Sequence, residues 1–206
     1  DPTTLGKRKL EADFDPIESA LKKGGSVLIY VPKSHIYSKQ IYGQFQKYIS
    51  MCQPIDDPIA IKMIDELKDY IGASTTDKLF YNSDMLEKLR CGIVVHHGSM
   101  PLTARLILEH FTQQGFCKIC FATSTLEQGI NMPFDVVYLD RFEESKTLSV
   151  KNLIGRAGRS TAKPIFDFGS VILRPNAMSR FRKVYQKKNI LSSKSRLDIT
   201  DDKMDE

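Results

Sequence analysis

Short apolar runs alternate with longer amphipathic stretches along most of the chain. Five of these runs have the length and composition of strands, at residues 26–31, 93–95, 117–122, 136–139 and 169–173. Short apolar runs bounded by turn residues are typical of strands that are buried on both faces of a parallel sheet. We therefore expect five parallel strands.

The stretches between these strands carry an apolar residue every three or four positions. They predict helices at residues 34–49, 58–72, 79–90, 102–114 and 148–156. Strands that alternate with helices predict an α/β fold, because parallel strands need long crossover connections. Two consecutive helices between the first two strands are more than one crossover needs, so we also expect a helical insertion around residues 50–90.

Three parts of the chain differ in composition. Residues 1–20 are mixed and polar, and we expect them to be a linker from an upstream domain. Residues 21–175 hold all the predicted strands and form the expected domain. Residues 176–206 predict a basic helical extension followed by a polar tail. The chain begins with Asp1 rather than methionine, which indicates a piece of a longer protein.

The composition is that of an ordinary globular protein, with 41% hydrophobic and 27% charged residues among 206. No apolar run approaches the roughly 20 residues that span a bilayer, and no basic-then-apolar leader is present. We therefore expect an intracellular, cytoplasmic protein with no membrane partner. The net charge of +5 is local, because eight basic and no acidic residues lie between Arg174 and Arg196. That run is either a solvated helix face or a nucleic-acid-binding surface.

Cysteine and histidine residues are the candidate metal ligands. The chain has four cysteines, which we expect to be free thiols in a reducing compartment. Cys117 and Cys120 lie on a predicted strand, where residues three apart point to opposite faces, so we expect two buried apolar thiols. His96 and His97 are adjacent at a strand end and also point apart. We therefore expect no metal site.

Polar, turn-rich segments follow several of the predicted elements. They are residues 31–34, 96–99, 122–133 and 152–159. In an open parallel sheet, ligands bind at the loops beyond the carboxyl ends of the strands. We expect these four segments to lie together at that edge.

The last of these segments contains Gly155-Arg156-Ala157-Gly158-Arg159. Residues three apart on a helix share one face, and the small residues between the arginines allow a close approach. Guanidinium groups bind phosphate oxygens in a bidentate manner and stay charged at any working pH. The pair is either a phosphate-binding site or two ordinary surface arginines.

In order, the four segments resemble the second RecA-like domain of superfamily-2 helicases. Residues 31–34 match motif IV, 96–99 the IVa region, 123–133 motif V and 152–159 motif VI. The sequences Ala-Thr-Ser-Thr-Leu-Glu-Gln-Gly-Ile-Asn-Met-Pro and Gly-Arg-Ala-Gly-Arg are most similar to the Ski-like DExH branch. The resemblance covers about residues 24–174 and implies a RecA-like parallel sheet flanked by helices.

The resemblance also implies the roles of particular residues in an ATP-dependent helicase. Arg156 and Arg159 would be catalytic arginine fingers that reach the γ-phosphate of ATP, which the upstream RecA-like domain would hold in cis with Mg²⁺. The nucleotide side would consist of Gly129, Asn131, Asn152, Gly155, Arg156 and Arg159. The phosphates of single-stranded DNA or RNA would be contacted by Lys33, Ser34, His97, Gly98, Thr123 and Ser124. Asn152 stands where the family usually has Gln, so its amide arm is one methylene shorter.

The chain contains neither a Gly-x-x-x-x-Gly-Lys-Ser/Thr phosphate loop nor an Asp-Glu-x-His box. The resemblance therefore implies the second motor domain of a helicase, inactive when separated from the first. One alternative is a non-catalytic module that keeps the fold and binds nucleic acid or protein. Another is a flavodoxin-like α/β domain with a different ligand, which leaves the paired arginines unexplained.

Overall fold

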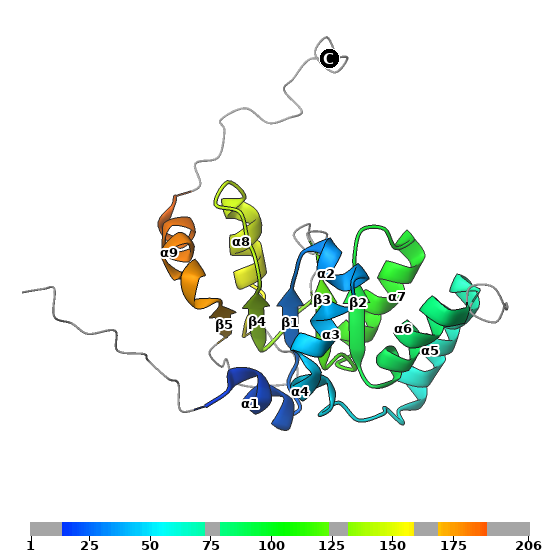
Figure 1. The fold of residues 1–206 in the computed structure, drawn as a ribbon. Helices are drawn as coiled ribbons and strands as arrows, with labels where there is room; N and C mark the ends of the chain where they lie inside the picture. Colours follow the sequence, from blue (N-terminus) through cyan, green and yellow to red (C-terminus); the bar gives the residue numbers. More distant parts are fainter. Residues whose placement is uncertain (1–13, 73–78, 124–131, 159–168, 189–206) are drawn as a thin grey trace, which may run out of the picture.

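A five-stranded parallel sheet forms the centre of the molecule (Figure 1). The computed structural model describes residues 14–72, 79–123, 132–158 and 169–188. The strands are β1 (Val27–Tyr30), β2 (Ile93–His96), β3 (Ile119–Ala122), β4 (Val136–Leu139) and β5 (Ser170–Leu173), in the spatial order β2-β3-β1-β4-β5. Every neighbouring pair is parallel, which confirms the predicted α/β class and sheet.

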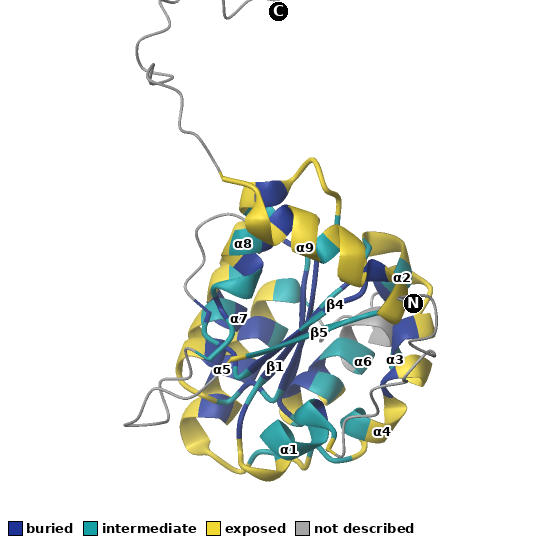
Figure 2. Ribbon diagram, turned by 90° about the vertical axis from the view of Figure 1, so that its left-hand side faces the viewer, coloured by how far each residue is buried: buried dark blue, intermediate teal, exposed yellow. Residues whose placement is uncertain are grey.

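Helices cover both faces of this sheet. They are α1 (Pro16–Lys22), α2 (Lys33–Tyr37), α3 (Gln40–Gln44), α4 (Gln46–Ile49), α5 (Pro58–Ile71), α6 (Leu79–Arg90), α7 (Leu102–Gln113), α8 (Thr147–Ile154) and α9 (Met178–Gln186), with a 3₁₀ turn, η3 (Pro175–Ala177), before α9. Figure 2 shows a sheet that is largely buried, with β5 only partly buried and exposed residues on the outer sides of the helices.

Alternate residues along the strands belong to two separate apolar clusters, one on each face of the sheet. On β1, Leu28 packs with α5, α7 and α8, whereas Val27 and Ile29 pack with α1 to α4. The same alternation holds on β3, where Cys120 and Phe121 belong to opposite clusters. Both faces of the sheet are therefore apolar, which is why the strands read as continuous apolar runs.

The N-terminal expectation needs a partial correction. Residues 16–20 belong to α1 and not to a linker, and Ile17 is buried against the sheet. Asp15 caps this helix, because its carboxylate accepts hydrogen bonds from the backbone amides of Ile17 (3.0 Å) and Glu18 (3.1 Å). The boundaries at residues 20 and 175 otherwise stay predictions, and residues 1–13 lie outside the described part.

The helix predicted at residues 34–49 is three short helices. Lys39 adopts a left-handed backbone conformation (φ 58°) between α2 and α3, and this conformation cannot continue a right-handed helix. Phe45 then separates α3 from α4. Apolar spacing predicted the buried face correctly, with Ile36, Ile41 and Phe45 in the core, but it does not report backbone breaks.

The helical insertion around residues 50–90 is present as α5 and α6. They pack against each other, and α5 also packs against α7 beside the β2 edge of the sheet (Figure 1). Ala60, Met63, Ile64 and Leu67 of α5 join the larger apolar cluster, so these helices extend the core of the domain.

The prediction for the Cys-x-x-Cys pair is wrong in one respect. Strand β3 begins at Ile119, so Cys117 lies before the strand. The alternation of strand side chains between the two faces of the sheet therefore does not apply to Cys117. Cys117 and Cys120 are both buried in the same cluster, and burial together with the adjacent Cys117 thiol raises the pKa of Cys120 well above its usual value. The Cys120 thiol is therefore protonated at neutral pH, and both buried cysteines pack as small apolar groups.

Candidate nucleic-acid and nucleotide site

A pocket of about 900 Å³ lies at the carboxyl edge of the sheet. It receives residues from the segments that follow all five strands, and from α8 and α9. Its lining consists of Tyr30, Val31, Pro32, Lys33, Gly98, Ser99, Thr123, Asp140, Arg141, Phe142, Glu143, Lys146, Val150, Arg174, Asn176 and Arg180. Parallel strands bring their carboxyl ends to one edge, so segments more than 140 residues apart in the sequence meet here.

The motif IV segment supplies one cation to this pocket, Lys33. It follows β1 at the start of α2, and its Nζ donates a hydrogen bond to Ser99 Oγ at 2.5 Å. The same ammonium lies 5.5 Å from the centre of the Tyr37 ring. These contacts hold the loops after β1 and β2 together and leave the exposed ammonium available to a phosphate.

The two histidines at the end of β2 point in different directions, as predicted. His96 is fully buried, and its Nε2 lies 3.1 Å from Glu109 of α7. His97 is half-buried and its ring lies 5.5 Å from that of Tyr37 in α2. Burial, followed by the positive charge of Lys33 and the neighbouring His96, lowers the pKa of His97. His97 is therefore neutral at pH 7 and does not add to the positive charge of the pocket.

Thr123 and Gly98 also line the pocket. Thr123 directly follows β3 and is 5% exposed, and its amide donates to the carbonyl oxygen of His96 at 3.2 Å. Ser34 is exposed on α2 but does not line the pocket. Ser124 lies outside the described residues. The structure thus brings Lys33, Gly98 and Thr123 to one pocket.

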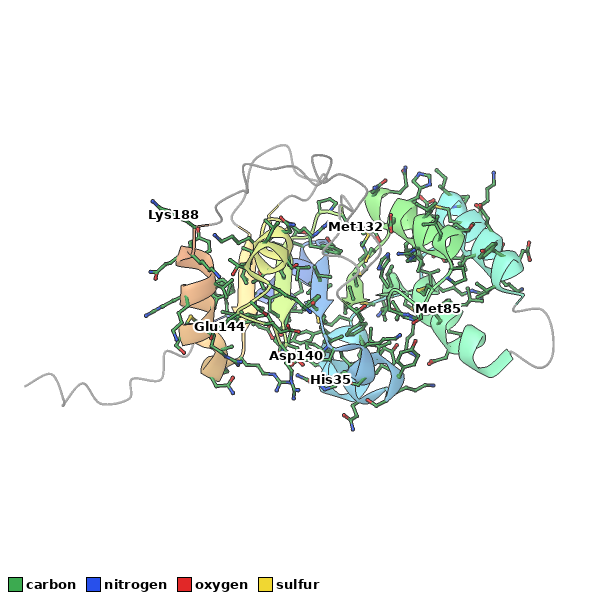
Figure 3. The ribbon with its side chains drawn as sticks, turned by 90° about the horizontal axis from the view of Figure 1, so that it is seen from above. His35, Met85, Met132, Asp140, Glu144 and Lys188 are labelled. Carbon is green, nitrogen blue, oxygen red and sulfur yellow. The ribbon has the colours of Figure 1, made fainter. Side chains whose placement is uncertain are left out.

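Sequence reasoning missed the β4 and β5 side of this pocket. Asp140 follows β4, and its carboxylate is 1% exposed. It forms an ion pair with Arg174 after β5. His35 of α2 also lies against it, with Nδ1 3.3 Å from Asp140 Oδ2; Figure 3 shows His35 beside Asp140. The only sequence signal was a charged residue immediately after an apolar run.

The pocket carries an excess of positive charge. Its lining includes five basic residues, Lys33, Arg141, Lys146, Arg174 and Arg180, and two acidic residues, Asp140 and Glu143. The difference is three positive charges in a concave surface, where low-dielectric walls strengthen the field that an anion meets. The pocket is therefore suited to phosphate groups.

The motif VI segment lies at the amino-terminal ends of the strands, opposite the pocket. This corrects the expectation that all four segments meet. Helix α8 runs back along the sheet, and the turn that follows it pairs with Phe134, two residues before β4 begins. The amide of Phe134 donates to the carbonyl oxygen of Arg156 at 3.0 Å, and the amide of Gly158 donates to Phe134 at 2.7 Å. This turn is at the amino ends of the strands.

Arg156 is not on a helix in this arrangement. Helix α8 ends at Ile154, Gly155 caps it, and Gly158 has a φ of 74°, so the helix does not continue through Arg156. Arg156 is 8% exposed, and its positive charge lies close enough to the buried Cys120 to affect that thiol's pKa. Asn152 is exposed on the last turn of α8, and Gly155 is half-buried.

Part of the predicted nucleotide side cannot be placed. Gly129, Asn131 and Arg159 lie outside the described residues. Within the described part, no three His, Cys, Asp or Glu side chains are grouped closely enough to hold a metal ion. None of the helices described is both long and apolar enough to cross a membrane.

Comparison with known proteins decides the family. The helicase conserved C-terminal domain family matches residues 59–161, which is half of the chain. The chain belongs to this family. The match covers the motif V and motif VI segments, α5 to α8 and strands β2 to β4.

Individual relatives of this helicase C-terminal domain belong to superfamily 2. ATP-dependent DNA helicase Hel308 of Caldivirga maquilingensis is 25% identical over 183 residues, which are 82% of this chain and 23% of the relative. Superkiller complex protein 2 of Mus musculus is 32% identical over 129 residues, 56% of this chain and 10% of the relative. The resemblance to the Ski-like branch is thereby confirmed, and the chain spans less than a quarter of either relative.

Among solved structures, S. cerevisiae Dbp5 bound to RNA and ADP BeF3 aligns with 82% of this chain and 34% of its own. The TM-score is 0.44 and the sequence identity 16%. No residue or role is assigned from this alignment.

Proposed function

We propose that this domain is the second motor domain of an ATP-dependent helicase, and that the pocket at the carboxyl edge holds the backbone of single-stranded DNA or RNA. The convergence of Lys33, Gly98 and Thr123 on one positively charged pocket carries the proposal. An ammonium, a backbone amide and a short hydroxyl recognise phosphates without reading bases, as a motor that moves along any sequence requires. Ser34, His97 and Ser124 would adjoin the same strand.

The turn after α8 would face ATP at the amino-terminal ends of the strands, opposite the pocket. In this proposal an upstream RecA-like domain in cis holds most of the ATP and its Mg²⁺, and the present domain adds Arg156 and Arg159 when the two close. Arginine fingers stabilise charge on the transferring phosphoryl group and are worth roughly 10³–10⁵ in rate. Gly129, Asn131, Asn152 and Gly155 would form the remaining contacts with the nucleotide.

The two edges give the proposal a physical logic. Nucleic acid would bind at the carboxyl ends of the strands and ATP near the amino ends, with β4 and α8 running between the two. Closure around ATP would then move the pocket together with the turn, because both belong to one packed core. A non-catalytic module that retains the fold is the alternative, and it predicts nucleic-acid binding without any effect of the arginines on ATP turnover.

Replacement of Arg159 by lysine tests the motor assignment in a protein that also contains the upstream domain. Lysine keeps the charge but lacks the planar fork, so Arg159→Lys should lower ATP turnover about 10³-fold or more while ATP affinity changes much less. Steady-state phosphate release, with and without single-stranded RNA or DNA, and nucleotide titration provide the measurements. Arg182→Lys, on the exposed surface of α9, is the matched control.

Arg156→Lys should have a similar effect on turnover. Because Arg156 is buried, the thermal melting of this variant must be compared with that of the wild type to detect a loss of stability. Wild-type turnover in a folded Arg159→Lys protein would remove the finger assignment and favour the non-catalytic alternative.

A further inference from the structure

The pocket extends beyond the helicase motifs, towards β5 and α9. Arg141 follows β4, Arg174 follows β5, and Arg180 belongs to α9; all three line the pocket, and none lies in a motif. The sequence left open whether the basic run that begins at Arg174 binds nucleic acid. The location of these three arginines beside Lys33, Gly98 and Thr123 bears directly on that question.

The charges on this side of the pocket are not all available to a ligand. Arg174 is paired with the buried Asp140, and Lys146 lies 3.0 Å from Glu143. Arg141 and Arg180 are exposed, and neither forms an ion pair with another residue in the described ranges. The positive charge that a phosphate would meet here therefore comes mainly from Arg141 and Arg180.

Helix α9 is held so that Arg180 faces the pocket. Val184 is buried in the main core, and Phe181 packs against Phe142 at 6.2 Å between ring centres. The Arg180 guanidinium lies 5.9 Å from the centre of the same Phe142 ring. These contacts orient Arg180 without neutralising its charge. The next two basic residues, Arg182 and Lys183, are exposed and do not line the pocket.

We infer that Arg141 and Arg180 form a phosphate-binding subsite that continues the single-strand track from the motif residues onto α9. Their guanidinium groups can bind phosphate oxygens in the bidentate manner that lysine cannot reproduce. The basic helical extension is therefore part of the nucleic-acid site, with Phe142 as the packing link between its helix and the loop after β4. This inference rests on the proposed nucleic-acid function of the pocket.

Binding of a fluorescein-labelled dT or rU oligonucleotide to this 206-residue chain tests the subsite. Anisotropy titrations at several salt concentrations would compare the wild type with the double variant Arg141→Gln/Arg180→Gln. We expect about tenfold weaker binding and a shallower dependence of log affinity on log salt, by about 0.7 for each lost phosphate contact. The charge-matched control is Arg182→Gln/Lys183→Gln on the same helix, which should stay within about twofold of the wild type.

Three further arms separate the possible outcomes. Equal loss in the pocket and control variants overturns the subsite and assigns the binding to net charge. No loss in either variant also overturns the subsite. Lys33→Gln tests the motif side: weakening there without an effect of the arginine pair retains the proposed function and overturns only this inference. A wild-type chain that binds neither oligonucleotide overturns both. Displacement of the oligonucleotide by millimolar ATP would identify the subsite as one for free nucleotides and would also overturn the inference.

Discussion

Single side chains decide how much positive charge the carboxyl-edge pocket presents. Asp140 is buried between His35 and Arg174 and offsets one of the cations on the β5 side. Lys33 is held by a hydroxyl and an aromatic ring, neither of which neutralises it. His97 lies beside Lys33 but is kept neutral by burial. Charge is thus concentrated on Lys33 and on the arginines across the pocket.

The lowered pKa of His97 predicts a pH dependence of stability. The unfolded state has a histidine pKa of about 6.5 and binds more protons than the folded state just below that pH. The free energy of unfolding should therefore fall as the pH decreases from 7.5 to 5.5. Urea denaturation at the two pH values measures this loss, which should be smaller in His97→Gln than in the wild type.

His96 contributes in the same direction, because burial also lowers its pKa, so the variant should retain part of the loss. The carboxylates of Asp15, Glu18 and Asp84 have lowered pKa values and lose their contribution only at more acidic pH, below this window. A pH dependence identical in the variant and the wild type would show that His97 protonates equally in both states.

At the scale of elements, the turn after α8 packs closely against the residue that precedes β5. Gly169 directly precedes β5, and a side-chain carbon placed on it would lie 2.4 Å from the backbone of Ala157 and 2.6 Å from that of Gly158. Only a residue without Cβ permits this contact. The position of Arg156 at the amino edge therefore depends on a glycine in another element.

Gly169→Ala should destabilise the domain by about 1–3 kcal/mol, because the methyl group meets backbone that cannot move aside cheaply. Gly43→Ala is the matched control: Gly43 lies in α3 with open space around it, and alanine there should be neutral or stabilising by up to about 1 kcal/mol. Urea denaturation of both variants tests the prediction. Similar effects at the two positions would count against the close contact at Gly169.

At the scale of the whole molecule, the two edges of the sheet have different roles in the proposed motor. The pocket collects the loops after all five strands, whereas the turn with Arg156 is fixed to Phe134 at the other edge. One core connects them, since β4 and α8 contribute Val137, Leu139, Val150 and Leu153 to the same apolar cluster. A domain built in this way can transmit closure at one edge to a strand bound at the other.

This 206-residue chain should not hydrolyse ATP on its own. Its sequence supplies arginines but no phosphate loop and no carboxylate box for Mg²⁺, so the groups that bind and polarise the triphosphate are missing. Phosphate release by the purified chain, with and without single-stranded RNA and DNA, should stay at the buffer rate. Turnover that disappears in Arg159→Lys would contradict this expectation, whereas turnover that persists would indicate a contaminant.

The sequence by itself determined the class of fold and the family. Apolar runs alternating with helical spacing are local signals, and a strand buried on both faces, such as β1 or β3, has to be apolar throughout. The order and composition of motifs V and VI identified the superfamily for the same reason: contiguous residues carry that information. Even the correct buried face of residues 34–49 followed from spacing alone.

Only the tertiary structure decided which segments meet. Spacing tells which face of a helix is buried but not at which end of the sheet the helix stops, so the turn with Arg156 was expected at the wrong edge. The same limit hid Arg141 and Arg180, which reach the pocket because Phe142 and Phe181 pack α9 against a loop almost 40 residues earlier in the chain. Cys117 joined the face of Cys120 because β3 begins two residues later than its apolar run. Each of these outcomes depends on packing between residues distant in sequence, and no local pattern encodes it.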